Sequence, residues 1–509
     1  MRLSHHIPGC LGLLAALFLC PPASGWTPPP QSGATPAPSP TVNEYWVGRI
    51  DLPERTLSEI PLVITLIPPL SPTGTWSVLL DIPPGPALPG ASATLMADVR
   101  MIDDTIEFVS PDEARNAFRF TRAGSEARGT VTVGGVQQLP LTLRRVPEAE
   151  ARQSMLDRPQ TPRPPFPYTQ EPVTVSSGAR VAPAEELTPL GATLVLPNPP
   201  FTTPYPAVLL IGEDGAERNQ SAGFHQPFAV LADALARAGF ASLRYDDRGS
   251  GLSGGDTAET TIEARTTDAA SLLSLLRADP RIDPSRIFIL GLGEGAVIAA
   301  QLARITTPQL TGLILLSGRA TTGATSIIER DRARLNAEGE SPAYIQQRLE
   351  RRTAVLNAAN AGDEPALRAA IAEEIRFDTE ARRGEGGGLQ DWQRDAFINQ
   401  SVQMYQSPRF RSFLPHDPIP ALKSITLPTL ALVASRDLTN PPATNLEPLK
   451  SALAAGNPAA EVHLLGGLNH RLQPCLTGFD DEVTDLTITI DPRALTHILT
   501  FARRHAAHP

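Results

Sequence analysis

From Val173 onward, the chain alternates short apolar runs with helical segments, and this alternation limits its fold more than any other feature. The apolar runs are residues 207–211, 241–245, 287–290, 313–316, 429–433 and 462–465. Segments with helical spacing lie between them, for example 227–238 and 266–277. Strands that alternate with helices predict a parallel, doubly wound sheet with helices on both faces. We therefore expect residues 173–509 to form one α/β domain.

The residues before this domain show a different pattern. Over residues 43–147, short segments with strand propensity are separated by Gly, Pro or Asp. The clearest segments are 62–67, 76–80, 117–121 and 129–133. Such spacing predicts a small antiparallel barrel or sandwich. A Pro-rich stretch predicts a stiff linker over residues 148–172, between this β-rich domain and the α/β domain.

One long insertion interrupts the α/β pattern at about residues 320–411, where the chain is mostly charged and helical. It follows the apolar run 313–316, and the carboxyl ends of strands border the ligand crevice in an open α/β sheet. We expect this insertion to form a helical lid. A helical excursion with a solvated, charged face would give the same sequence pattern.

The N-terminus has the features of a secretory signal. Arg2 is the only charged residue before an apolar core at 10–20, and Ala23-Ser24-Gly25 offers a cleavage site of small residues. Residues 1–25 are therefore predicted to be a signal peptide, followed by a Pro-rich disordered leader at 26–42. The protein is expected to be secreted or periplasmic. Lipid attachment at Cys20 is the weaker alternative, because the bulky Leu19 precedes that cysteine.

Composition excludes several partner classes. The 509 residues carry a formal charge of −10 with no clear basic patch, which argues against nucleic acid or an anionic membrane surface. No apolar run is long enough for a transmembrane helix. Of the three cysteines, only Cys475 lies beyond the signal, so the mature chain cannot form an internal disulfide.

A glycine-rich turn points to the chemistry. The hexapeptide Gly291-Leu292-Gly293-Glu294-Gly295-Ala296 follows an apolar run and precedes a helical pattern. It matches the Gly-x-Ser-x-Gly nucleophile elbow of an α/β-hydrolase, except that Gly293 stands in the place of the serine. Asp437 and His470 follow later apolar runs, in the order nucleophile, acid, histidine. We expect the fold to bring Gly293, Asp437 and His470 to one edge of the sheet.

Further segments give a family resemblance. They are Pro164-Pro165-Phe166-Pro167-Tyr168, Tyr245-Asp246-Asp247-Arg248-Gly249-Ser250-Gly251-Leu252-Ser253, Phe410-Arg411-Ser412-Phe413-Leu414 and Gly467-Leu468-Asn469-His470. On these residues the chain resembles secreted bacterial α/β-hydrolases of the carboxylesterase and serine-aminopeptidase-like group, over most of its mature length. The β-rich region also resembles a domain that often precedes these esterases. The resemblance implies hydrolysis of carboxylic esters through a Ser-Asp-His triad, without a cofactor, on a small-molecule ester or peptide-like ligand.

The chain departs from that group at two places. Gly293 has no side chain and cannot form an acyl-enzyme. The loop after the run 207–211 reads Gly-Glu-Asp-Gly-Ala-Glu-Arg, where the group has a Ser/Gly/Pro-rich turn that helps to form the oxyanion hole. The backbone N–H groups of Glu213 and Glu294 are the expected oxyanion donors, whereas the carboxylates of Glu213 and Asp214 would oppose developing negative charge there.

These departures predict a hydrolase-fold protein that has lost the family's chemistry and keeps ligand binding. Two alternatives remain open: hydrolysis by a water that an Asp437–His470 dyad activates, and a structural or interaction role in the cell envelope. Gly291-x-Gly293-x-x-Ala296 also matches a dinucleotide fingerprint, but no acidic residue follows the next strand. Neither a cofactor nor a metal is therefore expected. As substitute nucleophiles, Ser317 and Cys475 both lie off the elbow.

Overall fold

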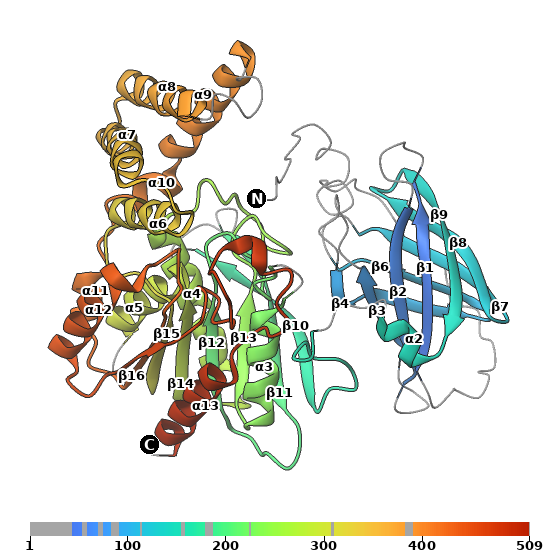
Figure 1. The fold of residues 1–509 in the computed structure, drawn as a ribbon. Coiled ribbons are helices and arrows are strands. Elements are labelled where there is room, and N and C mark those ends of the chain that lie inside the picture. The colour runs from blue at the N-terminus through green and yellow to red at the C-terminus, as the bar shows by residue number, and fades with distance from the viewer. Residues whose placement is uncertain are drawn as a thin grey trace. The chain divides into compact units, whose positions relative to one another are not determined.

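The computed structural model describes residues 43–52, 59–69, 75–82, 91–111, 115–153, 158–178, 187–222, 225–306, 310–381 and 390–507. The predicted signal peptide and leader, and the Gly-rich break at 384–388, lie outside these ranges. The chain divides into two compact units. The first is Met1–Phe166 with Ala222–His225, and the second is Pro167–Ser221 with Gln226–Pro509. Figure 1 shows a β-rich unit and an α/β unit, which we describe separately.

The first unit is a single antiparallel sheet in the order β4-β3-β2-β1-β9-β8-β7-β6-β5. Its strands are β1 Glu44–Asp51, β2 Glu59–Ile67, β3 Ser77–Ile82, β4 Ala91–Leu95, β5 Ala97–Ile102, β6 Thr105–Val109, β7 Ala117–Ala123, β8 Glu126–Val133 and β9 Gln137–Val146. Only Met96 separates β4 from β5, the two ends of the sheet, and its N–H donates to the carbonyl of Val78 at 2.9 Å. The sheet therefore closes on itself as a barrel, one of the two forms that the sequence predicted.

Alternating side chains fill the interior of this barrel. The buried apolar residues include Trp46, Leu62, Ile64, Leu80, Phe108, Phe118, Phe120, Val131 and Leu141. Two inward positions are glycines because the neighbouring strands approach closely. A Cβ at Gly48 would lie 1.9 Å from the carbonyl oxygen of Thr142, and one at Gly129 would lie 1.9 Å from that of Arg119. The strand pattern of this region thus serves a packed apolar core.

Part of the expected linker at 148–172 is ordered secondary structure. Helix α2, Glu148–Gln153, lies at its start, where Ala151 packs against Val63 and Val146. Strand β10, Tyr168–Ser177, takes up its end and pairs with β11 along its whole length. Pro172 is tolerated in β10 because this strand is at the edge of the sheet, where one side needs no backbone donor.

The second unit contains an eight-stranded sheet in the order β10-β11-β13-β12-β14-β15-β16-β17. Its remaining strands are β11 Thr188–Pro197, β12 Tyr205–Ile211, β13 Ala241–Tyr245, β14 Ile282–Leu292, β15 Gly312–Leu316, β16 Thr429–Ala434 and β17 Glu461–Leu465. The pairs from β13 to β17 are parallel, as predicted. Strands β10 and β11 add an antiparallel edge that the sequence pattern did not predict.

Helices cover both faces of this sheet (Figure 1). They are α3 Pro227–Arg237, α4 Ile262–Ala278, α5 Glu294–Thr306, α11 Ile419–Lys423, α12 Pro442–Gly456 and α13 Pro492–Ala506, with a short 3-10 helix at Asp480–Glu482. Successive residues of β12 point to opposite faces. Leu209 belongs to the apolar core that includes residues of α4, α5 and α12, whereas Leu210 belongs to the core that includes residues of α3 and α13. The strands β12, β15 and β16 are largely apolar and buried, because both of their faces are covered.

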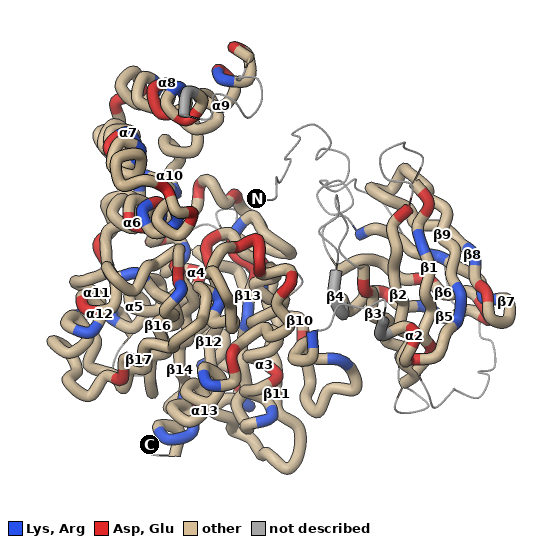
Figure 2. The backbone as a smooth tube through the Cα atoms, viewed as in Figure 1, with Lys and Arg blue, Asp and Glu red and all other residues tan. Residues whose placement is uncertain are grey.

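The insertion after β15 forms helices α6 to α10. They are α6 Gly323–Ala337, α7 Pro342–Ala361, α8 Glu364–Ala381, α9 Asp391–Gln406 and α10 Pro408–Phe413. The insertion has its own apolar core, which includes Val355, Leu356 and Val402. Figure 2 shows acidic and basic residues along these helices, and pairs such as Arg352–Asp331 join them. Among the described residues, none of the helices has the length and apolarity needed to cross a membrane.

Candidate functional site

Gly293 is the only residue between the end of β14 at Leu292 and the start of α5 at Glu294. Its φ is +57°, a conformation that glycine adopts freely and other residues adopt at a cost. Its N–H donates to the carbonyl of Leu316 at 2.9 Å. The turn is therefore a strand-to-helix elbow with glycine at its apex.

Asp437 and His470 lie beside this elbow. They follow β16 and β17, whose carboxyl ends share one edge of the sheet with that of β14. The Nδ1–H of His470 donates to Oδ2 of Asp437 at 2.8 Å. The other oxygen of this buried carboxylate accepts the N–H groups of Thr439, at 2.9 Å, and Asn440, at 2.7 Å. The orientation of the imidazole is thus fixed from its Nδ1 side.

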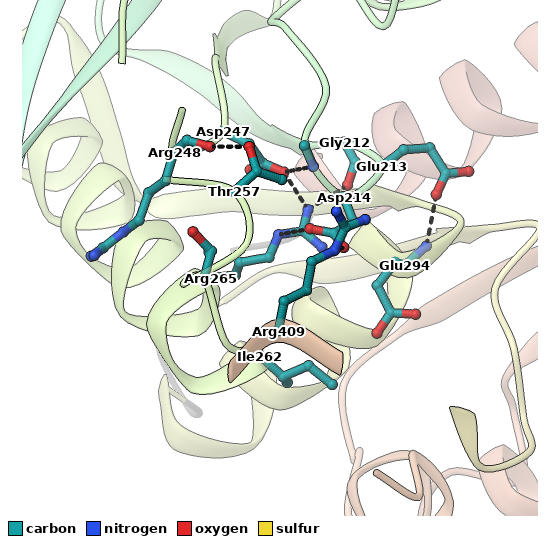
Figure 3. Close-up of polar contacts among 12 residues, drawn as sticks. Gly212, Glu213, Asp214, Asp247, Arg248, Thr257, Ile262, Arg265, Glu294 and Arg409 are labelled. Carbon is teal, nitrogen blue, oxygen red and sulfur yellow. Dashed lines mark hydrogen bonds and ion pairs between the residues drawn. The ribbon is translucent and has the colours of Figure 1, made fainter. Parts of the chain in front are cut away.

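The side chain of Glu213 occupies the place of the missing serine. A Cβ at Gly293 would lie 2.0 Å from Oε1 of Glu213. The Nε2–H of His470 donates to the same oxygen at 2.5 Å. The second carboxylate oxygen accepts the N–H of Glu294 at 3.2 Å, a contact that Figure 3 shows as a dashed line. One oxygen of Glu213 therefore stands where the serine hydroxyl would be, and the other where an oxyanion would be.

Both backbone donors that the sequence proposed for the oxyanion hole already have partners. The N–H of Glu213 donates to Oε1 of Gln220 at 2.8 Å and does not face Gly293 as a free donor. The N–H of Glu294 donates to the carboxylate of Glu213 itself. Glu213 thus enters the site through its side chain, a placement that the sequence did not predict.

Electrostatics keeps this arrangement charged. Burial disfavours the imidazolium of His470, but the charges and hydrogen bonds of Asp437 and Glu213 outweigh it and raise the pKa of His470 to about 10. Burial also opposes the carboxylate of Glu213, yet His470, the N–H of Glu294 and the charge of Arg471 lower its pKa below the ordinary value. At neutral pH an imidazolium is therefore held between two carboxylates, and it has no lone pair with which to accept a proton.

A buried polar network holds the loop of Glu213 (Figure 3). Arg265 donates to the carbonyl of Gly212 at 2.9 Å and pairs with Asp247 at 2.9 Å. Asp247 in turn accepts the N–H of Gly215 at 2.9 Å. Asp214 forms an ion pair with Arg409 at the start of α10, so the helical insertion is tied to this loop.

The two substitute nucleophiles do not join the site. Ser317 directly follows β15 and has a φ of +48°, and its buried hydroxyl has no hydrogen-bond partner within the described ranges. Its backbone bonds run to Leu432 and Asn440. Cys475 is buried, and burial raises the pKa of its thiol to about 11, which keeps the sulfur neutral.

The structure also bears on cofactors and ligands. The carboxylate of Glu213 lies at the N-terminus of α5, where a dinucleotide would place its pyrophosphate. A dinucleotide site would also have an acidic residue after the next strand, β15. The basic Arg319 lies there instead and pairs with Glu294 at 2.9 Å. In the described part of the chain, no three His, Cys, Asp or Glu side chains are grouped so as to hold a metal ion. One open groove of about 400 Å³ lies among α7, α8 and α9, lined in part by Ile371, Phe397 and Met404.

The chain is similar to a known protein family and to several solved structures. The model of the serine aminopeptidase S33 family matches residues 222–341, which include the elbow. One similar solved structure is an esterase of Pyrococcus furiosus, with 13% identity, coverage of 67% of this chain and 92% of that chain, and a TM-score of 0.39. A second is an α/β-hydrolase of Penicillium, with 14% identity, coverage of 67% of this chain and 99% of that chain, and a TM-score of 0.40. A third is the proline iminopeptidase of Mycobacterium smegmatis, with 16% identity, coverage of 66% of this chain and 99% of that chain, and a TM-score of 0.38. No curated protein matches the sequence. The fold assignment rests on the strand order and the family model.

Proposed function

We propose that this chain, an α/β-hydrolase of the esterase and serine-aminopeptidase-like group, no longer hydrolyses esters by the serine route and instead binds a ligand at the carboxyl edge of its sheet. One observation carries the proposal: the carboxylate of Glu213 fills the place of the serine hydroxyl and is paired with His470. The ligand class that the family resemblance suggests is a small ester or a peptide-like molecule.

None of the three groups that the serine mechanism needs is available for catalysis. The nucleophile is absent at Gly293, the Nε2 of His470 is bound to a carboxylate, and the N–H of Glu294 is bound to that same carboxylate. The serine route uses all three groups together: the nucleophile, the base and the oxyanion donor.

The water route is also disfavoured. In that route, the Asp437–His470 dyad would take a proton from water at the position of the missing hydroxyl. The pKa of His470 is raised to about 10 by its two carboxylate partners, and the oxygen of Glu213 stands in the water's place. The dyad therefore does not act as a general base at neutral pH.

An assay of short-chain nitrophenyl esters tests the proposed function. We expect the natural protein and its His470→Ala variant to hydrolyse the esters at the same background rate. Turnover by the natural protein that His470→Ala abolishes would contradict the proposal. Asp485→Ala, which removes an exposed carboxylate after the short 3-10 helix, controls for nonspecific effects of substitution.

We also propose that the protein acts outside the cytoplasm, in the periplasm or the medium. The proposal rests on the sequence of residues 1–25, which has the order of a secretory signal. N-terminal sequencing of the protein from its native cells tests it. A chain that begins near Trp26 is expected, and a chain that begins at Met1 in the cytoplasm would overturn it.

A further inference from the structure

The contacts of Glu213 describe how a free carboxylate would bind at this site. Oε1 accepts from the imidazolium of His470, and Oε2 accepts from the backbone N–H of Glu294. The two donors belong to separate elements, the loop after β17 and the first turn of α5, yet both point at one carboxyl group. A charged donor and a neutral donor that converge on two oxygens are a suitable pair for one carboxylate.

The donors stay in place without Glu213. His470 is held from its other side by Asp437, whose side chain is 0% exposed. The N–H of Glu294 belongs to the first residue of α5, and the N–H of Gly293 directly before it donates to the carbonyl of Leu316 at 2.9 Å. Neither donor depends on Glu213 for its position, so removal of the carboxyl group would leave a preformed binding site.

Glu213 itself is able to leave. Its side chain is 32% exposed, whereas that of His470 is 8% exposed. Its backbone is fixed by the bond from its N–H to Gln220, so rotation about its side-chain bonds moves the carboxyl group to water while the loop stays in place. The carboxylate therefore closes the site as a displaceable side chain.

We propose that His470 and the N–H of Glu294 form a binding site for a small monocarboxylate, and that Glu213 is its built-in competitor. This inference rests on the proposed function, because it takes the site to be used for binding. It names the ligand class as an organic monocarboxylate, the acid part of an ester. When Glu213 withdraws, the imidazolium of His470 is balanced by Asp437, so the site suits a single negative charge better than a phosphate dianion.

Competition by the carboxylate of Glu213 lowers the affinity of the natural protein for a carboxylate ligand. A ligand that binds only the open form has its apparent dissociation constant raised by the inverse of the open fraction. If Glu213 fills the site in about 99 of 100 molecules, its removal tightens binding by about a hundredfold. Carboxylates should therefore bind weakly to the natural protein and much more tightly to Glu213→Ala.

Calorimetric titration with sodium acetate and sodium butyrate tests the proposal. We expect Glu213→Ala to bind these anions at least about tenfold more tightly than the natural protein. Sodium phosphate at the same ionic strength is expected to bind at least about tenfold more weakly than acetate. Glu213→Ala/His470→Gln should lose the gain, and Glu447→Ala, which removes an exposed carboxylate on α12, should bind as the natural protein does.

Three results would overturn the proposal: equal affinity of Glu213→Ala and the natural protein, binding that survives His470→Gln, or equal affinity for acetate and phosphate. Circular dichroism checks the fold of each variant. If Glu213→Ala is unfolded, Glu213→Ser replaces it, because serine also removes the carboxyl group and keeps a polar side chain in this loop. Ester hydrolysis by the natural protein would contradict the proposed function alone, since the titrations need no turnover.

Discussion

The two sides of the site differ in what they keep. On the acid side, Asp437 and His470 have the hydrogen bond that a serine hydrolase requires. On the nucleophile side, the serine is a glycine, and the oxyanion donor Glu294 serves a carboxylate from the neighbouring loop. The difference shows that the two departures are one coupled change. The carboxylate of Glu213 fits only because residue 293 has no Cβ.

The coupling predicts that neither departure can be reversed alone. A serine at position 293 would meet Oε1 of Glu213, which lies 2.0 Å from the position of a Cβ there. We expect Gly293→Ser/Glu213→Ala to hydrolyse nitrophenyl acetate at least about a hundredfold faster than the natural protein, a small part of the roughly millionfold effect of a full triad. Gly293→Ser alone should remain close to the background rate.

The control for this restoration is the triple variant that adds His470→Ala, in which activity should disappear. If Gly293→Ser alone is as active as the double variant, Glu213 does not obstruct the nucleophile position. In that case the changes at Gly293 and Glu213 are independent of each other, which contradicts the coupling.

The acid side of the site, Asp437 with His470, should contribute more to stability than the nucleophile side. Asp437 is fully buried and bonds His470 and two backbone N–H groups, so Asp437→Ala leaves an imidazolium without its buried partner. We expect a loss of about 3–5 kcal/mol in the free energy of unfolding, measured by urea denaturation. The exposed Asp485→Ala should change it by less than about 0.5 kcal/mol. Equal effects would show that the Asp437–His470 pair is not a buried anchor.

The pH dependence of stability tests the link between the two sides. The pKa of His470 rises from 6.5 to about 10 on folding, so its contribution is complete below pH 6.5 and is lost as the pH rises through about 10. The lowered pKa of Glu213 gives stability that is present above its ordinary value of 4.5 and is lost in acid. The melting temperature should therefore fall between pH 6.5 and 10, and Glu213→Gln should flatten that fall. Parallel curves for the two proteins would contradict the pairing.

Gly293→Ser should destabilise the protein less than Asp437→Ala does. The φ of +57° at this position costs another residue on the order of 1–3 kcal/mol, and the new side chain also displaces Glu213. We expect a folded protein with a lower melting temperature. Gly466→Ser is a matched control, because a Cβ there has no neighbour within 4 Å. A higher melting temperature for Gly293→Ser would show that residue 293 is not the strained apex of an elbow.

Much of the α/β unit followed from local pattern. Runs such as 207–211 and 313–316 became β12 and β15, because buried parallel strands are apolar on both faces. The antiparallel pair β10 and β11 was missed, since β10 contains Pro172 and polar residues that fit only at an edge. The ordered segments at 148–153 and 168–172 were not predicted, because the residues around them are rich in Pro and indicate a linker.

The site was predictable only where topology alone determines position. Gly293, Asp437 and His470 follow strands of one sheet, so their proximity was expected. The missing side chain at Gly293 was visible in the sequence, but the rotamer that brings the carboxylate of Glu213 into that space has no sequence signature. The one available signal was the acidic pair Glu213-Asp214 in a loop that otherwise forms an oxyanion hole.

The most direct test of the account is the protonation state of His470 in the natural protein, measured by nitrogen NMR of the imidazole at pH 8. A ring between two carboxylates should be protonated on both nitrogens, because the pKa is raised to about 10. In Glu213→Gln the pKa should fall, and the signal should move toward that of the neutral ring. A neutral His470 in the natural protein at pH 8 would contradict the claim that Glu213 holds the place of the serine.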